Sequence, residues 1–434
     1  MNDLLGLSAL HDRWSRPEPP PRAGRVIGVQ GTLVTAEVPS ARVGEVCDID
    51  GAGPAQLVGF RGPHALLMPF GVLDGVTHGA AVRCSGELPV AMVGDTMRGR
   101  VVDGFGQAID GKGPMLGLVP RPLHAKPPEA MGRSLVRQAL PTGVRVLDGL
   151  LTMGRGQRVG LIAGSGVGKS TLMGMIARRS AADVNVIALV GERGREVREF
   201  LEDVLGPEGL ARSVVVVVTS DQAPVLQLRG AAYAMSVAEH FRDQGRDVML
   251  MLDSVTRLAM AQRQIGLAVG EPPTTRGYTP SCFAMLPRLL ERAGTADKGS
   301  ITALYTVLVD GDDVEADPIG DAVRGIVDGH VILSRRIAAE GRFPAVDVLP
   351  SISRVMQAVV TPEFDEAARK MRAILNTWAQ NEELIRLGAY KAGSSPQVDA
   401  AIARIDKIYA WLAQPVREAT AFESVLPGMQ ALVK

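Results

Sequence analysis

The sequence predicts an α/β fold in which an α/β core follows an N-terminal β-barrel and precedes a C-terminal helical domain. Short alternating segments rich in glycine come first, runs of valine, isoleucine and leucine alternate with helical patterns next, and helix-forming residues dominate the end. With 434 residues, of which 46% are hydrophobic, the chain is long enough for several buried cores. The expected divisions are residues 1–22, 23–92, 93–361 and 362–434.

Residues 1–22 read as an amphipathic helix followed by a proline-rich tether. Leu4, Leu7 and Trp14 recur at helical spacing, and the stretch "RPEPPPR" would end the helix. The start lacks the basic leader and long apolar run of a secretory signal. An exposed apolar stripe ahead of a folded body needs a partner surface, so we expect a docking helix, with a frayed terminus as the alternative.

The barrel is expected from short segments such as "RVIGVQGTLVTAEV", "AQLVGF" and "ALLMPF", which glycines interrupt at close intervals. The chain has three cysteines: Cys47, Cys84 and Cys282. They form no CxxC motif and have no histidine cluster beside them. This pattern predicts inert thiols in a reducing cytosol, and it argues against a zinc site or a disulfide framework.

The core is expected to be a parallel sheet that is buried on both faces. Near-continuous apolar runs such as "NVIALVG", "SVVVVVTS" and "DVMLMLD" are typical of such strands. The helical domain is expected from "EFDEAARKMRAILNTWAQNEELIRL" and "VDAAIARIDKIYAWLAQ", which are rich in strong helix formers.

The charge balance disfavours a partner that is itself highly charged. Lysine and arginine number 47 together, as do aspartate and glutamate, so the formal net charge is zero. Nothing in this balance attracts nucleic acid or an anionic membrane over the whole surface. No run reaches the ~18 apolar residues of a membrane-spanning helix.

A phosphate-binding loop is expected between the strand "QRVGLIAG" and the helix that follows it. Its glycines would let backbone amides approach a β-phosphate, and its lysine would reach the β- and γ-phosphate oxygens. Its serine hydroxyl would bind Mg²⁺, the expected cofactor together with ATP. Ala163 stands where the strict motif has glycine, and a small residue there should still allow the tight turn. The expected nucleotide-binding residues are Gly164, Ser165, Gly166, Val167, Gly168, Lys169, Ser170 and Thr171.

Two further strands end in groups suited to phosphoryl transfer. Asp253 closes "DVMLMLD", where a carboxylate can orient the water shell of Mg²⁺. Glu192 and Arg193 follow "NVIALVG", where a carboxylate can orient an attacking water. Each could also have a structural role: an aspartate often caps a strand, and Gly-Glu-Arg could be a solvated turn.

From about Gly24 to the C-terminus, the chain resembles the catalytic subunits of rotary ATPases. It is most similar to their export relatives, the ATPases of flagellar and virulence type III secretion systems. Five motifs in matching order carry the resemblance: "GSGVGKST", "GERGREVREF", "MLDSVTRLAMAQRQIGLAVGEPP", "GYTPSCFAMLPRLLERAG" and "FPAVDVLPSISRVM". The resemblance implies a RecA-like ATPase core between the barrel and the helical domain, in a hexameric ring.

The resemblance also implies roles for individual residues. Glu192 would polarise the hydrolytic water, and Arg193 and Arg257 would lie beside the γ-phosphate. Arg354 would be an arginine finger that reaches across the subunit interface, and Phe343 would stack on adenine. One chain carries both the phosphate loop and Arg354, so a ring of identical subunits is the simplest assembly.

The function implied is ATP hydrolysis that energises protein export through the flagellar type III apparatus, by releasing and unfolding substrates and chaperones. "DPIGDAVRGIVDGH" and "LIRLGAYKAGSSPQVDAAI" favour the flagellar branch. The alternatives are a virulence secretion ATPase, a rotary ATP synthase or pump subunit, and a nucleic-acid translocase, which the charge balance and the 4% aromatic content disfavour. The implied partners are a stator-like regulator dimer bound through residues 1–20, export substrates with their chaperones, and the membrane export gate. The implied location is cytoplasmic, peripheral to the inner-membrane export apparatus.

Overall fold

The structure of the chain is a computed structural model that describes residues 22–309 and 317–434. The expected docking helix and nearly all of its tether therefore lie outside the described residues. The chain forms two compact units, one of residues up to Pro89 with Ala268–Gly270, and the other of Val90–Leu267 with Glu271–Lys434.

The first unit is a closed β-barrel, as the sequence predicts. Its strands are ordered β1-β2-β5-β4-β3-β6, and valine, leucine and alanine side chains fill its interior. Tight turns join the strands where glycine adopts positive φ, as at Gly31, which follows β1. The strands are β1 (Arg22–Gln30), β2 (Leu33–Glu37), β3 (Val46–Ile49), β4 (Gly53–Arg61), β5 (His64–Pro69) and β6 (Ala81–Cys84).

The cysteine prediction was wrong for two of the three residues. Cys47 on β3 and Cys84 on β6 form a disulfide across directly paired strands, with their Cα atoms 4.1 Å apart. The two cysteines are separated by 37 positions in the sequence, so only the closure of the barrel brings them together. Cys282 is a buried free thiol, as predicted.

The second unit is built on a nine-stranded sheet, whose main path is ordered β17-β16-β10-β15-β13-β11-β12-β8. The central strands are parallel, as predicted, whereas β17 and the short β14 pair antiparallel with their neighbours. The strands are β8 (Arg100–Val102), β10 (Arg158–Ala163), β11 (Val184–Glu192), β12 (Ser213–Thr219), β13 (Asp247–Asp253), β14 (Gly294–Thr295), β15 (Ser300–Leu308), β16 (Gly329–Leu333) and β17 (Val346–Ser353). A separate hairpin-like pair joins β7 (Val90–Val93) and β9 (Val119–Pro122).

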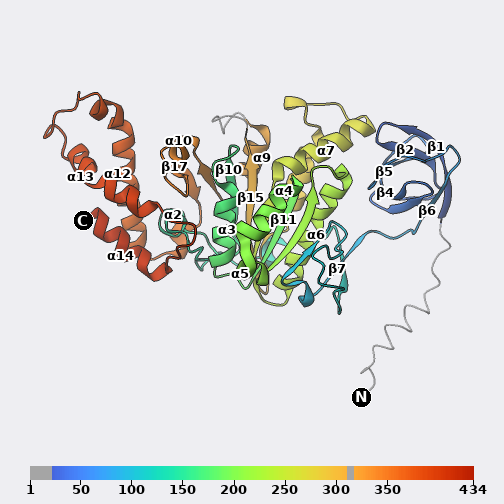
Figure 1. Ribbon diagram of the computed structural model, residues 1–434, viewed down its shortest axis with the longest axis horizontal. Helices are drawn as coiled ribbons and strands as arrows, with labels where there is room; N and C mark the ends of the chain where they lie inside the picture. The colour runs from blue at the N-terminus through green and yellow to red at the C-terminus, as the bar shows by residue number, and fades with distance from the viewer. Residues whose placement is uncertain (1–21, 310–316) are drawn as a thin grey trace, which may run out of the picture. The chain divides into compact units, whose positions relative to one another are not determined.

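The sheet strands are apolar throughout because both faces are covered. Along β11, Val186 and Ala188 contribute to one hydrophobic core, and Ile187 and Leu189 to the other. Helix α3 packs in one core and α6 in the other, so the sheet lies between two helical layers (Figure 1). The helices of these layers are α2 (Arg145–Leu150), α3 (Lys169–Arg179), α4 (Gly194–Glu199), α5 (Gly206–Ala211), α6 (Pro224–Asp243), α7 (Val255–Val269), α8 (Pro280–Leu290), α9 (Pro318–Ile326), α10 (Arg335–Ala339) and α11 (Met356–Val359).

Three helices end the chain: α12 (Pro362–Arg386), α13 (Pro396–Leu412) and α14 (Phe422–Val433). Thr361 and Ser395 cap α12 and α13 through their hydroxyl oxygens, and a proline follows each cap. The apolar faces of these helices join the same core as α2 and α3. A helical C-terminal region is therefore confirmed.

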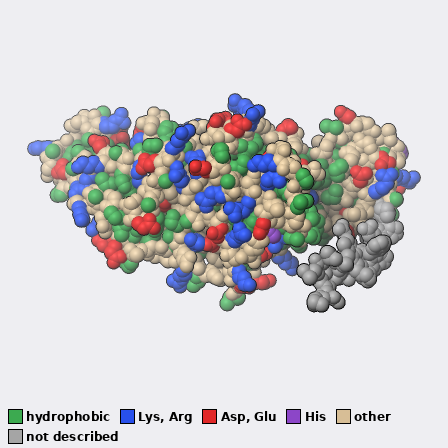
Figure 2. Space-filling view, turned by 60° about the horizontal axis from the view of Figure 1, so that its bottom comes forward, with side chains coloured by type: hydrophobic (Ala, Val, Ile, Leu, Met, Phe, Trp, Pro, Cys, Tyr) green, Lys and Arg blue, Asp and Glu red, His purple; other side chains and the backbone are tan. Residues whose placement is uncertain are grey.

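Charged side chains of both signs are interspersed on the face drawn in Figure 2. Among the described residues, no helix has the length and apolar character needed to cross a membrane.

Candidate functional site

The phosphate loop lies where the sequence places it, between the end of β10 and the start of α3. Gly166 and Gly168 adopt positive φ angles of 78° and 93°, which a residue with a Cβ atom rarely adopts. Helix α3 begins at Lys169, so its free backbone N–H groups and the positive end of its dipole face the loop. Val167 is buried and anchors the loop, whereas Ser165 and Gly166 are exposed. The loop is thus shaped for an anion.

Two carboxylates converge on Lys169. Glu192 ends β11 and Asp253 ends β13, and these strands are neighbours in the parallel sheet, so both side chains lie at its carboxyl edge. The Lys169 Nζ donates hydrogen bonds to Asp253 Oδ1 and, over 3.4 Å, to Glu192 Oε1. The Thr306 hydroxyl also donates to Asp253 Oδ1, at 2.7 Å. These contacts bring together the lysine and the two acids that the sequence predicts.

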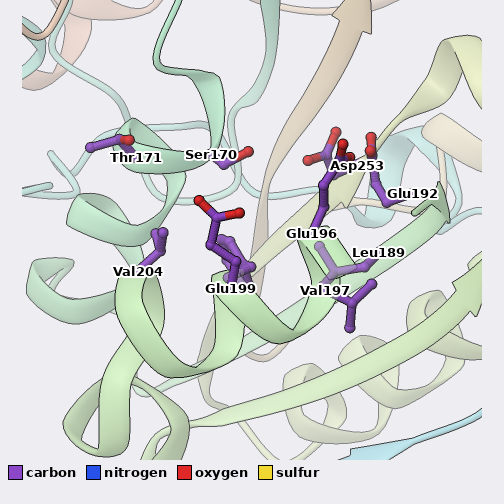
Figure 3. A pocket seen from close by; sticks show the side chains of 10 residues that line it. Ser170, Thr171, Leu189, Glu192, Glu196, Val197, Glu199, Val204 and Asp253 are labelled. Atoms are coloured by element: carbon purple, nitrogen blue, oxygen red, sulfur yellow. The ribbon is translucent and has the colours of Figure 1, made fainter. Parts of the chain in front are cut away.

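A cavity of about 200 Å³ opens beside these groups. Ser170 and Thr171 line one side, and Glu192 and Asp253 line the other (Figure 3). Glu196 and Glu199 of α4 add two carboxylates to the wall, which the sequence analysis did not single out. Glu196 lies on the short helix α4 that follows Glu192 at the end of β11, and no helical spacing in the sequence links the two residues.

The pKa values of the Glu192 and Glu196 carboxyl groups are shifted in opposite directions. Burial raises the pKa of Glu192 above its usual value, and the charge of Asp253 and a hydrogen bond with Glu196 add to this rise, against the charge of Lys169. At Glu196, burial acts to raise the pKa, but hydrogen bonds from Glu192 and Arg193 favour the ionised form. The pKa of Glu196 is therefore lowered overall. Glu192 is therefore the member of this pair that holds a proton more readily.

The two arginines predicted beside the γ-phosphate lie near the end of β11. Arg193 is largely exposed, and its Nη1 donates to Glu196 Oε1 at 3.0 Å. Arg257, on α7, packs against Gly191, where a Cβ atom would come within 2.7 Å of the arginine Cβ. The Arg257 Nε is buried and has no hydrogen-bond partner among the described residues. Both side chains flank Glu192, but neither lines the cavity.

Phe343 lies beside the last glycine of the phosphate loop. Its ring is 3.8 Å from the position that a Cβ atom on Gly168 would occupy. The side chain is 46% exposed although it is aromatic, so it is not a core residue. An exposed ring beside the loop is suited to stacking on a base.

Arg354 and the phosphate loop lie at opposite ends of the parallel strands: the loop follows the carboxyl end of β10, and Arg354 lies near its amino end. Its backbone N–H donates to the carbonyl of Asp328, whose own N–H donates to the carbonyl of Arg158 at the start of β10. The loop follows the other end of β10, five residue steps of about 3.3 Å away. The side chain is exposed and lines an open groove of about 700 Å³. Arg354 therefore cannot reach the phosphate loop of its own chain.

The donor set of the cavity fits a small hard cation. Ser170 offers a hydroxyl, and Glu192, Glu196 and Asp253 offer carboxylate oxygens, which are the ligands that Mg²⁺ prefers. Among the described residues, Glu45, Cys47 and Cys84 in the barrel form the one cluster whose possible ligand atoms all lie within 4.8 Å of one another, and there the disulfide removes both sulfur ligands. The oxygen-rich cavity beside the phosphate loop is thus the better place for a cation.

Comparison with known families agrees with this geometry. The nucleotide-binding domain of the ATP synthase alpha/beta family matches residues 143–353. The C-terminal domain of the type III secretion ATPase EscN matches residues 360–431.

Similar proteins span nearly the whole chain. A flagellum-specific ATP synthase of Bacillus subtilis is 51% identical over 417 residues, which is 95% of each chain. A type 3 secretion system ATPase of Xanthomonas euvesicatoria is 50% identical over 410 residues, 93% of this chain and 92% of its own. The assembled ATPase EscN of enteropathogenic E. coli, at 43% identity, superposes with a TM-score of 0.91 over 95% of this chain and 100% of its own. A second EscN structure, in complex with its central stalk EscO, gives a TM-score of 0.88.

Proposed function

This chain belongs to the family of flagellum-specific ATP synthases and type III secretion ATPases, and we propose that it hydrolyses ATP in a ring of six identical subunits to drive protein export through a flagellar apparatus. One observation supports the ring: the phosphate loop lies at the carboxyl ends of the parallel strands, and Arg354 lies at their amino ends. Each site therefore needs an arginine from a neighbour. A closed ring of identical copies supplies one at every interface.

ATP binds first through its phosphates. The glycine-rich loop offers backbone N–H groups to the β-phosphate, and Lys169 transfers its hydrogen bonds from Asp253 to the phosphate oxygens. Ser165, Val167 and Thr171 belong to this loop and its helix, and contribute mainly backbone groups. Phe343 stacks on the adenine, because its exposed ring flanks the loop.

Magnesium accompanies the nucleotide. The Ser170 hydroxyl would hold the ion directly, and the Asp253 carboxylate would orient its water shell. When bound, the ion neutralises charge on the β- and γ-phosphates.

Glu192 orients the water that attacks the γ-phosphorus. Its carboxylate accepts a hydrogen bond from that water, so the ionised form is the working one. Arg193 and Arg257 flank it and contribute positive charge beside the γ-phosphate. Their place at the end of β11 supports these assignments.

Arg354 of a neighbouring subunit stabilises the charge that develops on the transferring phosphoryl group. Arginine fingers in other phosphoryl-transfer systems are worth about 10³–10⁵ in rate. We therefore expect specific ATPase activity to rise with protein concentration, as rings form. The Arg354→Ala variant should fold and bind nucleotide, but its specific activity should not rise with protein concentration. The test measures ATPase activity over a range of protein concentrations and follows ring formation by light scattering.

Arg386→Ala is the matched control for that titration, because it removes an arginine that is exposed on α12, far along the chain from the sheet. It should behave as the parent. A normal rise of activity with concentration in Arg354→Ala would mean that Arg354 does not act in trans.

Flagellar export is favoured over a virulence system by the motifs near Asp317 and Gly388. The flagellar relative from Bacillus subtilis and the type 3 secretion relative from Xanthomonas euvesicatoria are almost equally similar to this chain, at 51% and 50% identity, so the branch needs a genetic test. Deletion from the host should abolish filament assembly if the chain serves flagellar export. Intact filaments with lost effector secretion would point to the virulence alternative, and a defect in ATP synthesis to the rotary ATP synthase.

The proposed partners follow from the same role. A stator-like regulator dimer would bind residues 1–20, export substrates and chaperones would engage the ring, and the membrane export gate would hold it peripherally at the inner membrane on the cytoplasmic side. One related structure contains a central stalk protein, EscO. The zero net charge of the chain, with charges of both signs interspersed on the face drawn in Figure 2, supports protein partners and not nucleic acid.

A further inference from the structure

Arg335, the first residue of α10, lies over the phosphate loop. A Cβ atom built on Gly164 would come within 2.8 Å of the Arg335 Nε and 3.0 Å of its Nη2. Gly164 is buried, whereas the next two loop residues are exposed. The guanidinium group therefore covers the loop at the point where it leaves β10.

The segment that carries Arg335 touches the loop a second time. Phe343 follows α10 and lies against Gly168, the last glycine of the loop. Ser334, directly before Arg335, caps α10, and Ile337, between the two contacts, is buried. We call residues 334–344 the loop-flanking segment. It borders the phosphate loop at both of its ends.

The loop-flanking segment is itself held by the C-terminal part of the chain. The Phe343 carbonyl accepts a hydrogen bond of 2.8 Å from the backbone N–H of Gln414, a residue that is 2% exposed. The Arg342 guanidinium lies 3.8 Å from the centre of the Tyr409 ring on α13, a cation–π contact. The segment is thus fixed at one end while Arg335 contacts the loop from the other.

We propose that Arg335 is a positioning residue for nucleotide binding, an inference that rests on the proposed ATPase site. The loop is rich in glycine, so its backbone amides need an external contact to stay oriented toward the phosphates. A planar guanidinium packed on Gly164 provides that contact, and its permanent positive charge favours an anion in the loop. Arg335 acts through Gly164 and takes no part in the chemical step.

The geometry permits a double-mutant cycle. Gly164 does not adopt a left-handed conformation, so alanine fits its backbone, and the three atoms nearest to the new Cβ all belong to the flexible end of Arg335. Gly164→Ala should therefore displace the guanidinium and mimic Arg335→Ala. Each change should weaken binding of the fluorescent nucleotide mant-ADP with Mg²⁺ about tenfold, the loss of one contact to a charged group. The double variant should lose no more than the weaker-binding single variant.

Steady-state kinetics separates positioning from a general structural defect. In Arg335→Ala the KM for ATP should rise as binding weakens, while kcat changes by a much smaller factor. Arg336→Ala is the matched control, because the side chain of Arg336 pairs with Glu340 and Glu382 and does not cover the loop. Its affinity and KM should equal those of the parent.

Parent-like affinity in Arg335→Ala, or losses that simply add in the double variant, would overturn the proposal. Lys169→Ala, measured in the same assay, separates this failure from a failure of the proposed function. If Lys169→Ala loses binding and Arg335→Ala does not, only the role of Arg335 is wrong. If Lys169→Ala binds as the parent does, the nucleotide does not occupy the phosphate loop, and both proposals fail.

Discussion

Lys169 and Glu192 touch each other in the structure, yet their proposed roles divide binding from hydrolysis. Lys169→Ala removes the charge that holds the phosphates, so both nucleotide binding and turnover should be lost. Glu192→Gln keeps the shape and removes only the water-orienting carboxylate. Its binding should be retained while turnover falls about 10²–10⁴-fold. Titration with mant-ADP and a phosphate-release assay measure the two effects.

Glu202→Gln is the matched control for Glu192→Gln, because Glu202 is exposed and pairs with Arg198 outside the cavity. It should turn over as the parent does. Equal turnover in Glu192→Gln and the parent would remove Glu192 from the mechanism.

The protonation of Glu192 should limit activity at acidic pH. Its pKa is raised, mainly by burial and in part by Asp253 and Glu196, so the working carboxylate is lost at a higher pH than an ordinary glutamate would require. Glu196→Gln replaces a proton acceptor with an amide that can donate to ionised Glu192. The acid limb of the kcat profile should therefore move to lower pH. An unmoved limb, or one that moves to higher pH, would contradict the coupling of the two carboxyls.

At the scale of elements, buried strands and the phosphate loop were predictable because their signals are local. The strand β11 is a continuous apolar run, and the acids Glu192 and Asp253 directly follow such runs. Parallel strands then bring their carboxyl ends together, which explains why the predicted acids meet Lys169. Glu196 was missed because helix α4 is too short to give a clear helical period.

Other features depend on contacts between distant segments, which no local pattern encodes. The disulfide needs β3 and β6 to pair after the barrel closes. The position of Arg354 follows from β17 running antiparallel to β16, and Arg335 meets Gly164 only because β16 lies beside β10. The sequence motifs marked Arg354 and Phe343 through resemblance alone.

The disulfide should stabilise the barrel and leave nucleotide binding unchanged, since the proposed site residues all lie in the other unit. A closed loop of 37 residues is worth at most about 4 kcal/mol in the chain-entropy model. Cys47→Ala with Cys84→Ala should lower the free energy of unfolding by about 2–4 kcal/mol. Chemical denaturation measures this, with reductant added to the parent as the control. If alkylation of unfolded, unreduced protein labels all three cysteines, the disulfide does not form.

At the scale of the whole molecule, the N-terminal segment is expected to serve partners and not the ring. Deletion of residues 2–18 should spare the fold and the basal ATPase activity, because the barrel begins at Arg22. Binding to the stator-like regulator should be lost, since Leu4, Leu7 and Trp14 each contribute about 1.5–3 kcal/mol when fully buried. Pull-down with the purified regulator compares the two proteins. Retained binding would place the docking site elsewhere, and an insoluble truncation would mean that the helix belongs to the core.

The proposed ring depends on one geometric fact: each chain carries the phosphate loop at the carboxyl ends of its parallel strands and Arg354 at their amino ends. Identical subunits can then complete one another, and a lone subunit lacks its finger. The similar ATPase EscN was solved in its assembled form, which agrees with this arrangement. The central claim is therefore that every active site is shared between two copies of the chain.

Mixing two inactive variants tests this claim most directly. Arg354→Ala retains Glu192, and Glu192→Gln retains Arg354, so mixed rings contain interfaces with both groups intact. Random assembly of equal amounts would make roughly a quarter of the interfaces complete. ATPase activity should therefore return on mixing, while each variant alone stays inactive at the same total concentration. A mixture that forms rings but remains as inactive as its components would contradict the shared site.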